Sequence, residues 1–200
     1  MLEACHGVTV RPVTDALCFR CTGCGECCRK LRVAVTDSDL ERLVRASGIQ
    51  AADLVDWLEP GAVDMSGEPE SFVELGQGRR LMVLAHGSGG CRFLDANARC
   101  GVYEARPADC RLFPFDVDAG RRPHRLELLP FTGCDYARDG HNDEQAIVLD
   151  DTARWRELSS YQARVASWNR GARHRRRLGK RVGGAGEYLK FLGLGPAHLA

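Results

Sequence analysis

The sequence predicts a small α+β domain of short strands and short helices, irregular between them, followed by a carboxy-terminal helix. Short runs in which apolar and polar residues alternate occur between turn residues, and this pattern is typical of strands. A longer stretch with apolar residues at helical spacing occurs in residues 151–170. Ten of the 200 residues are cysteine, mostly in one cluster or at the ends of these runs, which predicts an irregular fold held together by its thiols.

The amino-terminal part is expected to be loop followed by a strand. Residues 1–17 are an irregular lead-in by this prediction. Residues 18–30, CFRCTGCGECCRK, form a compact loop in which Gly23 and Gly25 supply turns and close backbone approach. Residues 31–35 alternate between apolar and other residues as a short strand does.

Two helical segments come next. The first covers residues 38–46, where Asp37 and Asp39 are expected to cap the helix and Gly48 lies beyond its end. The second covers residues 51–59 and stops at the following Pro-Gly pair.

The next part is predicted to consist of strands and turns, with one short helix. Strands are expected at residues 72–75, 80–85 and 124–129, and a hairpin at residues 91–94 with 99–103. Pro107 begins a short helix that carries Cys110. We therefore divide the chain into a lead-in (1–17), a cysteine-cluster domain (18–135), and a carboxy-terminal helix with a basic tail (136–200).

The charge of the chain is unevenly distributed. The formal net charge is +1, but residues 151–200 hold 11 Lys and Arg against 3 Asp and Glu, a net charge of +8. The remaining residues hold 17 basic and 24 acidic side chains, a net charge of −7. An acidic body with a basic carboxy-terminal part is therefore expected.

The sequence also predicts a cytoplasmic location without membrane association. The amino terminus shows neither a basic segment nor an apolar run of signal-peptide length, and no stretch approaches the roughly 18 apolar residues of a membrane helix. Thiols stay reduced in the cytoplasm, so clustered cysteines there indicate metal rather than disulfides.

The spacing Cys21-x2-Cys24-x2-Cys27-Cys28 carries the most information. Thiolates two residues apart on a turn can converge on one centre, and the bacterial ferredoxin run also starts C-x2-C-x2-C. Zinc is the alternative, because its all-cysteine sites need only four thiolates. Ordinary zinc ribbons use two C-x2-C pairs, however, and the sequence has no second pair. The spacing favours an iron–sulfur cluster, 4Fe-4S in particular, and leaves zinc open.

Four dispersed cysteines complete the candidate ligand set. The predicted metal ligands are Cys21, Cys24, Cys27, Cys28, Cys91, Cys100, Cys110 and Cys134. Neighbouring side chains diverge on most backbones, so the pair Cys27-Cys28 is expected to serve two centres, or to leave one thiol spare. Eight thiolates divide into two four-ligand sites or into one cluster with spare thiols, and the sequence leaves both open.

Basic residues surround the cysteines. Arg106 and Arg111 are expected to take structured positions near Cys110, to offset thiolate charge and to lower thiol pKa values. Arg29 and Lys30 fit solvated surface equally well. His86 lies five residues before Cys91, and we interpret it as a loop histidine rather than a ligand.

These motifs together resemble a known family. The motifs that carry the resemblance are Phe19-x-Cys21-x2-Cys24-Gly25-x-Cys27-Cys28-Arg29, Cys91-x-Phe-Leu, Cys100-x-Val-Tyr103-Glu-x-Arg106-Pro107-x2-Cys110-Arg111-x-Phe-Pro114 and Cys134. They resemble those of the CxxCxxCC cysteine-cluster family, the YkgJ-like proteins, over residues 18–135. The resemblance implies a zinc- or iron-chelating domain with the eight cysteines as ligands. Cys5 and Cys18 fall outside the pattern.

Three functions follow as hypotheses. The first is a metal-binding protein, with electron transfer, redox sensing and metal handling all open, together with the option of a protein partner. The second is an enzyme that modifies a protein substrate, because one branch of the family is similar to flagellin lysine N-methylases; no glycine-rich methyl-donor signature is found here. The third is a zinc protein that contacts nucleic acid through residues 170–181, although a solvated helix end explains these charges more simply.

Overall fold

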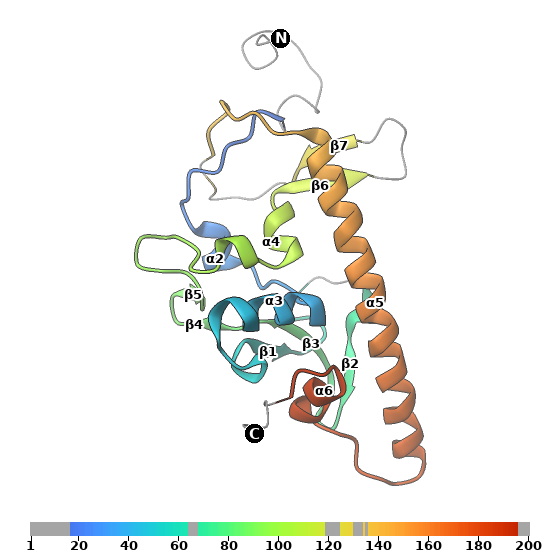
Figure 1. Cartoon of the computed structure of the whole chain (residues 1–200). Helices are drawn as coiled ribbons and strands as arrows, with labels where there is room; N and C mark the ends of the chain where they lie inside the picture. Colours follow the sequence, from blue (N-terminus) through green and yellow to red (C-terminus); the bar gives the residue numbers. More distant parts are fainter. Residues whose placement is uncertain (1–16, 64–67, 119–124, 130–133, 135, 196–200) are drawn as a thin grey trace.

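The computed structural model describes residues 17–63, 68–118, 125–129, 134 and 136–195, and it confirms the α+β class (Figure 1). The α-helices in this part of the chain are α2 (Glu26–Lys30), α3 (Asp37–Ser47), α4 (Ala108–Leu112), α5 (Glu144–Arg177) and α6 (Ala185–Phe191). The strands are β1 (Val55–Leu58), β2 (Val73–Leu75), β3 (Gly78–Leu84), β4 (His86–Gly87), β5 (Gly90–Cys91), β6 (Phe115–Asp118) and β7 (Arg125–Leu128). Single 3-10 turns cover Ala51–Asp53 (η1), Pro69–Ser71 (η2) and Tyr103–Ala105 (η3).

The main sheet has three antiparallel strands in the order β1-β3-β2. The end of β3, Leu81–Leu84, is buried on both faces, which explains why its apolar residues run without interruption. Met82 and Leu84 belong to the main hydrophobic core, whereas Leu81 and Val83 pack with Phe72 in a smaller cluster on the opposite face. The strands predicted at 72–75 and 80–85 are confirmed within one to two residues.

Helix α3 forms where its capping residues predict. The Thr36 hydroxyl accepts a hydrogen bond from the Asp39 backbone N–H, and the Asp39 carboxylate accepts one from the Thr36 N–H. Gly48 ends the helix in the left-handed conformation. Leu40 and Leu43, one turn apart, are fully buried in the main core. The predicted helix over 38–46 and the capping role of Asp39 are therefore confirmed. Asp37 is not a cap: it is the first residue of the helix and pairs with Arg164 on α5.

Tertiary pairing changed several of the predicted elements. Residues 55–58 form strand β1 rather than the end of a helix over 51–59, because pairing with β3 satisfies their backbone groups. The stretch 31–35 is a single bridge, between Ala34 and Val83, rather than a strand. The predicted loop over 18–30 contains helix α2. The hairpin predicted for 91–94 with 99–103 is reduced to one bridge, between Leu94 and Cys100.

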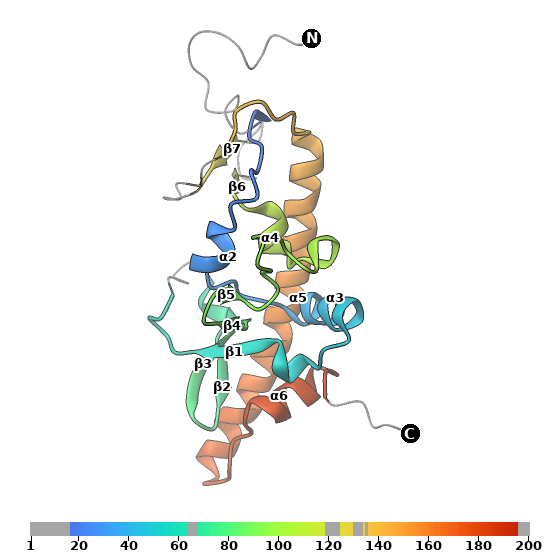
Figure 2. The same ribbon diagram turned by 90° about the vertical axis from the view of Figure 1, so that its left-hand side faces the viewer.

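A second, smaller core lies beside the amino-terminal half of α5. The unpredicted strand β6 pairs with β7, which was predicted at 124–129, and this hairpin packs on α4 and α5 (Figure 2). Leu112, Leu126 and Ile147 form the buried centre of this cluster. The thiols described below lie between the two cores.

Helix α5 connects the two cores. It runs over 34 residues, longer than the predicted 151–170, and at 1.5 Å per residue it spans about 50 Å. The side chain of Asp143 caps it by accepting a hydrogen bond from the Gln145 N–H. Its amino-terminal half buries Ile147 in the smaller core, and its carboxy-terminal half buries Val165 in the main core.

The segment after α5 folds back onto the main core instead of continuing as a basic tail. Helix α6 buries Tyr188 and Leu189 beside α3 and the main sheet. Gly183 allows this return, because a Cβ at that position would lie 2.8 Å from the Trp168 ring. None of the helices in the described ranges combines the length and the apolar character needed to cross a membrane.

Candidate metal centre

The predicted ligands lie on α2, β5 and α4 or in the segments between elements, and α2, β5 and α4 are neighbours in space (Figures 1 and 2). Cys21 and Cys24 precede α2, and Cys27 and Cys28 lie on it. The later cysteines come from separate parts of the chain: Cys91 in β5, Cys100 in the bridge to Leu94, Cys110 on α4, and Cys134. All eight are free thiols, and all but Cys21 are partly buried. Cys18, in contrast, is disulfide-bonded, and Cys5 lies outside the described residues.

Six of the eight cysteines line one cavity of about 790 Å³. These are Cys21, Cys27, Cys28, Cys91, Cys100 and Cys110. Apolar side chains from β6 and α5 line the same cavity, including Phe115, Val117 and Trp155. A volume of this size is typical of sites for organic ligands and exceeds what one metal ion occupies.

A close backbone approach brings α2 and β5 together. Gly90 adopts φ +116°, and a Cβ there would lie 2.7 Å from the Cys28 carbonyl oxygen and 2.8 Å from the Arg29 Cα. Only glycine fits this contact without displacement of the backbone. Because Cys91 is the next residue, the approach carries the Cys91 thiol toward that of Cys28.

The adjacent thiols Cys27 and Cys28 on α2 lie close to each other and to the charges of other thiols. The Sγ atoms of Cys27 and Cys28 are 4.0 Å apart. The hydrogen bond between the two thiols lowers the pKa of Cys28, whereas burial and the charges of Cys91, Cys110 and Cys100 raise it. The same hydrogen bond, with burial, raises the pKa of Cys27. Cys28 therefore lies within the electrostatic reach of the three cysteines on β5, α4 and the loop between them.

A second group forms around Cys134. Burial, the charge of Cys24 and a hydrogen bond to Cys24 raise the pKa of the Cys134 thiol to about 11, and Cys21 and Cys27 add to this effect. The backbone N–H of Gly23 donates to the Cys21 Sγ at 3.4 Å. A glycine between two of the cysteines therefore provides a backbone donor to sulfur.

Burial dominates the electrostatics of the thiols. It is the main cause of the raised pKa values of Cys91 and Cys110. The prediction that Arg106 and Arg111 lower the pKa of the Cys110 thiol is therefore wrong. Cys110 does lie in the first turn of α4. A raised pKa favours the protonated thiol, so a bound cation must displace these protons.

The arginines near the cysteines donate hydrogen bonds to backbone carbonyl oxygens rather than to thiolates. Arg29, which was equally compatible with solvated surface, donates to the Cys24 carbonyl oxygen at 2.6 Å and so closes the first cysteine loop. The Arg106 guanidinium lies 3.5 Å from the centre of the Tyr103 ring and donates to the Tyr103 carbonyl oxygen. Arg111 donates to the Arg106 carbonyl oxygen, so the structured positions predicted for both are confirmed.

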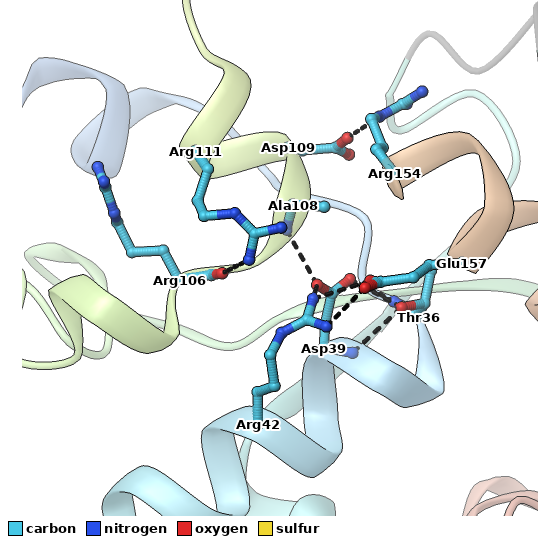
Figure 3. A network of polar contacts seen from close by, with 9 residues as sticks. All are labelled: Thr36, Asp39, Arg42, Arg106, Ala108, Asp109, Arg111, Arg154 and Glu157. Carbon is cyan, nitrogen blue, oxygen red and sulfur yellow. Dashed lines mark hydrogen bonds and ion pairs between the residues drawn. The ribbon is translucent and has the colours of Figure 1, made fainter. Parts of the chain in front are cut away.

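A buried polar network fixes α4 against α3 and α5 (Figure 3). The Asp39 carboxylate accepts a hydrogen bond from the Ala108 N–H at 2.9 Å, and Arg42 joins Asp39 to Glu157 on α5. Arg154 on α5 pairs with Asp109. Since Asp109 precedes Cys110, this network determines where that thiol lies. The sequence identifies Asp39 only as a helix cap, and its second role has no local signal.

His86 lies directly opposite Cys91 in the β4–β5 pair and also lines the cavity. Burial lowers its pKa, and its backbone N–H donates to the Asp56 carboxylate at 3.1 Å. A lowered pKa leaves the imidazole neutral near pH 7.

Within the described ranges, no three Cys, His, Asp or Glu side chains lie close enough together to hold a metal ion without adjustment. Binding of an ion therefore requires the thiols to move toward one another.

The sequence of the chain is similar to one family of known proteins. A family model, CxxCxxCC, described as a "putative zinc- or iron-chelating domain", matches residues 20–132. Comparison with curated proteins and with solved structures gave no match. The matched region contains seven of the eight cysteines and extends over more than half of the 200 residues. The chain therefore belongs to the CxxCxxCC family of zinc- or iron-chelating domains.

Proposed function

We propose that this protein binds metal through two groups of four thiols. The first group is Cys28, Cys91, Cys100 and Cys110, and the second is Cys21, Cys24, Cys27 and Cys134. The observation that carries the proposal is that six of these thiols line one cavity, in which the Sγ atoms of Cys27 and Cys28 are 4.0 Å apart. The division into groups follows the neighbours of each thiol: Cys91, Cys100 and Cys110 act on Cys28, and Cys21, Cys24 and Cys27 act on Cys134, while Cys27 also acts on Cys91 and Cys110. Membership in a zinc- or iron-chelating family supports metal as the ligand.

The donor set suits an iron–sulfur cluster or zinc. Eight sulfur donors favour soft or borderline metals over magnesium or calcium. We favour iron–sulfur clusters because the C-x2-C-x2-C run resembles that of ferredoxins and the Gly23 N–H already donates to sulfur. A cluster would supply one-electron redox chemistry, whereas zinc would act as a structural cross-link.

The protein's own residues have separate tasks in this proposal. The network around Asp39 positions α4, Gly90 allows β5 to approach α2, and Arg29 closes the loop that carries Cys24. Partial burial of the thiols limits access of water and of oxidants. The proposal requires a reducing compartment, and the cytoplasm provides one.

Metal and sulfide analysis tests the proposal. We expect anaerobically purified protein to contain iron and acid-labile sulfide and to absorb visible light. Colourless protein with zinc and without labile sulfide would remove the iron–sulfur version and retain metal binding. Protein that holds neither iron nor zinc, even after reconstitution under reducing conditions, would contradict the proposal.

A second candidate function, modification of a protein substrate, is favoured by the size and lining of the cavity. Tyr103 and Trp155 line it and are 56% and 46% exposed, so an apolar rim faces solvent next to the thiols. Calorimetry with S-adenosylmethionine tests the methyl-transfer version. Heat of binding at micromolar concentration is the expected result, and no interaction with the metal-loaded protein would count against that version.

A further inference from the structure

The last turns of α5 carry a row of basic side chains on one face. Arg170, Arg173, His174 and Arg177 follow the spacing i, i+3, i+4, i+7, which places them together on one side of the helix. All four are exposed. We call this set the basic face. Figures 1 and 2 both show this end of α5 extending past the main sheet, so the helix is accessible there.

The opposite side of the same helix packs on the protein. Val165 and Ala172 are buried. The Trp168 Nε1–H donates to the Glu74 carbonyl oxygen at 2.8 Å, and the Asn169 amide donates to the Phe72 carbonyl oxygen at 2.9 Å. At 100° per residue, these positions lie about 90–170° from the centre of the basic face. The basic face therefore points away from the molecule.

Carboxylates pair with two other cations of this region. Arg176 pairs with Glu74, and Arg181 pairs with Glu187 at 2.7 Å. Arg181, a hydrogen bond from the Gly184 N–H and the charge of Arg175 lower the pKa of Glu187 to about 2. In the part of the chain that the structure describes, no hydrogen bond or ion pair joins the basic face to a carboxylate. Its positive charge is therefore uncompensated by the protein itself.

We propose that the basic face binds the phosphate backbone of double-stranded nucleic acid. Guanidinium groups present several donors in a fixed fork that matches phosphate oxygens, and three of the four residues are arginine. The row spans seven helical rises, about 10 Å, which is enough to reach two neighbouring phosphates on one strand. Binding of this kind is electrostatic and independent of base sequence.

A protein partner fits this surface less well. Specific protein interfaces have an apolar centre, but the two helical turns directly before the basic row present the small residues Ala163, Ala166 and Ser167 on this side. Compensation of the helix dipole also does not account for the row, because that effect is confined to the last turn. Arg170 and Arg173 lie before the last turn.

Fluorescence anisotropy with a labelled 20-base-pair duplex of mixed sequence tests the proposal. The full-length protein should bind at 50 mM salt, with log Kd rising linearly with log salt. The double variant Arg173→Gln/Arg177→Gln should bind about tenfold or more weakly at 100 mM salt, and its salt slope should fall by about 1.8. Circular dichroism and metal content, which should be unchanged, separate this result from a failure of folding or of the metal proposal.

A variant with the same change in net charge provides the control. Arg45→Gln/Arg156→Gln removes two exposed arginines away from the basic face and should bind the duplex as the wild type does. The proposal is overturned if the two double variants weaken binding equally, or if the wild type does not bind the duplex at 50 mM salt. Tighter binding to polyglutamate, or to vesicles containing phosphatidylserine, would also overturn it in favour of another anionic partner.

Discussion

The Asp39 carboxylate accepts a hydrogen bond from the Ala108 backbone N–H, although the two residues are 69 positions apart in the sequence. The same carboxylate completes the capping box of α3 through Thr36. One buried carboxylate therefore caps the amino-terminal ends of both α3 and α4. It fixes the start of α4, two residues before Cys110. This contact links the main core to the thiol-lined cavity.

Substitution of Asp39 should consequently affect both stability and the metal site. Asp39→Asn keeps the size of the side chain but removes the charge that holds Arg42, and we expect it to lower the free energy of unfolding by about 1–3 kcal/mol. Urea denaturation measures this loss, and metal content should fall with it. Glu41→Gln, an exposed position on the same helix, is the control and should change neither quantity.

Cysteine substitutions should separate the two proposed groups. Cys110→Ala should remove the metal of the first group and destabilise the fold, because metal binding and folding are coupled. Cys21→Ala should remove the metal of the second group with the same consequence. Each variant should retain about half of the wild-type metal, as measured by elemental analysis. Loss of all metal in both variants would indicate one shared centre, and Cys5→Ala, outside the ligand set, should leave metal content unchanged.

Gly90 should tolerate no side chain. Gly90→Ala places a Cβ within 3 Å of the α2 backbone at a positive φ, so either α2 or β5 must shift. We expect a loss of roughly 1–3 kcal/mol of stability, together with weaker metal retention against a chelator. Gly87→Ala is a matched control in the paired strand, since a Cβ there meets nothing within 4 Å. Equal effects of the two substitutions would refute the close-approach argument.

Glu187 should contribute stability that depends on pH. Its pKa is lowered to about 2, chiefly by Arg181, so the folded state binds the proton of Glu187 more weakly than the unfolded state does. The contribution is therefore present above about pH 4.5 and declines as the pH falls toward 2. The urea midpoint of Glu187→Gln should lie below that of the wild type at pH 6, and the difference should shrink by pH 3. A difference that stays constant over this range would disprove the assignment.

Local sequence signals predicted the elements whose ends are set by a few neighbouring residues. Helix α3 was predicted because Thr36, Asp39 and Gly48 fix its two ends locally. The start of α4 followed from Pro107, whose fixed φ suits the beginning of a helix. The eight cysteines were identifiable for a similar reason, since their spacing is visible in the chain.

Elements that depend on distant partners were not predictable in this way. Residues 55–58 follow a 3-10 turn, but they become a strand because β3 supplies their hydrogen bonds. Helix α6 follows a basic, glycine-rich run that carries no helix signal, and it forms where Tyr188 can be buried in a core built by earlier segments.

The sequence by itself determined which residues carry sulfur, which turns separate them, and where charge concentrates along the chain. Only the tertiary structure decided which thiols are neighbours, because that depends on the backbone approach at Gly90 and on the hydrogen bond between Asp39 and Ala108. It also decided that Arg176 and Arg181 pair with carboxylates while the basic face points outward. Spacing along a chain is a local property, whereas proximity in space is set by packing between segments far apart in sequence.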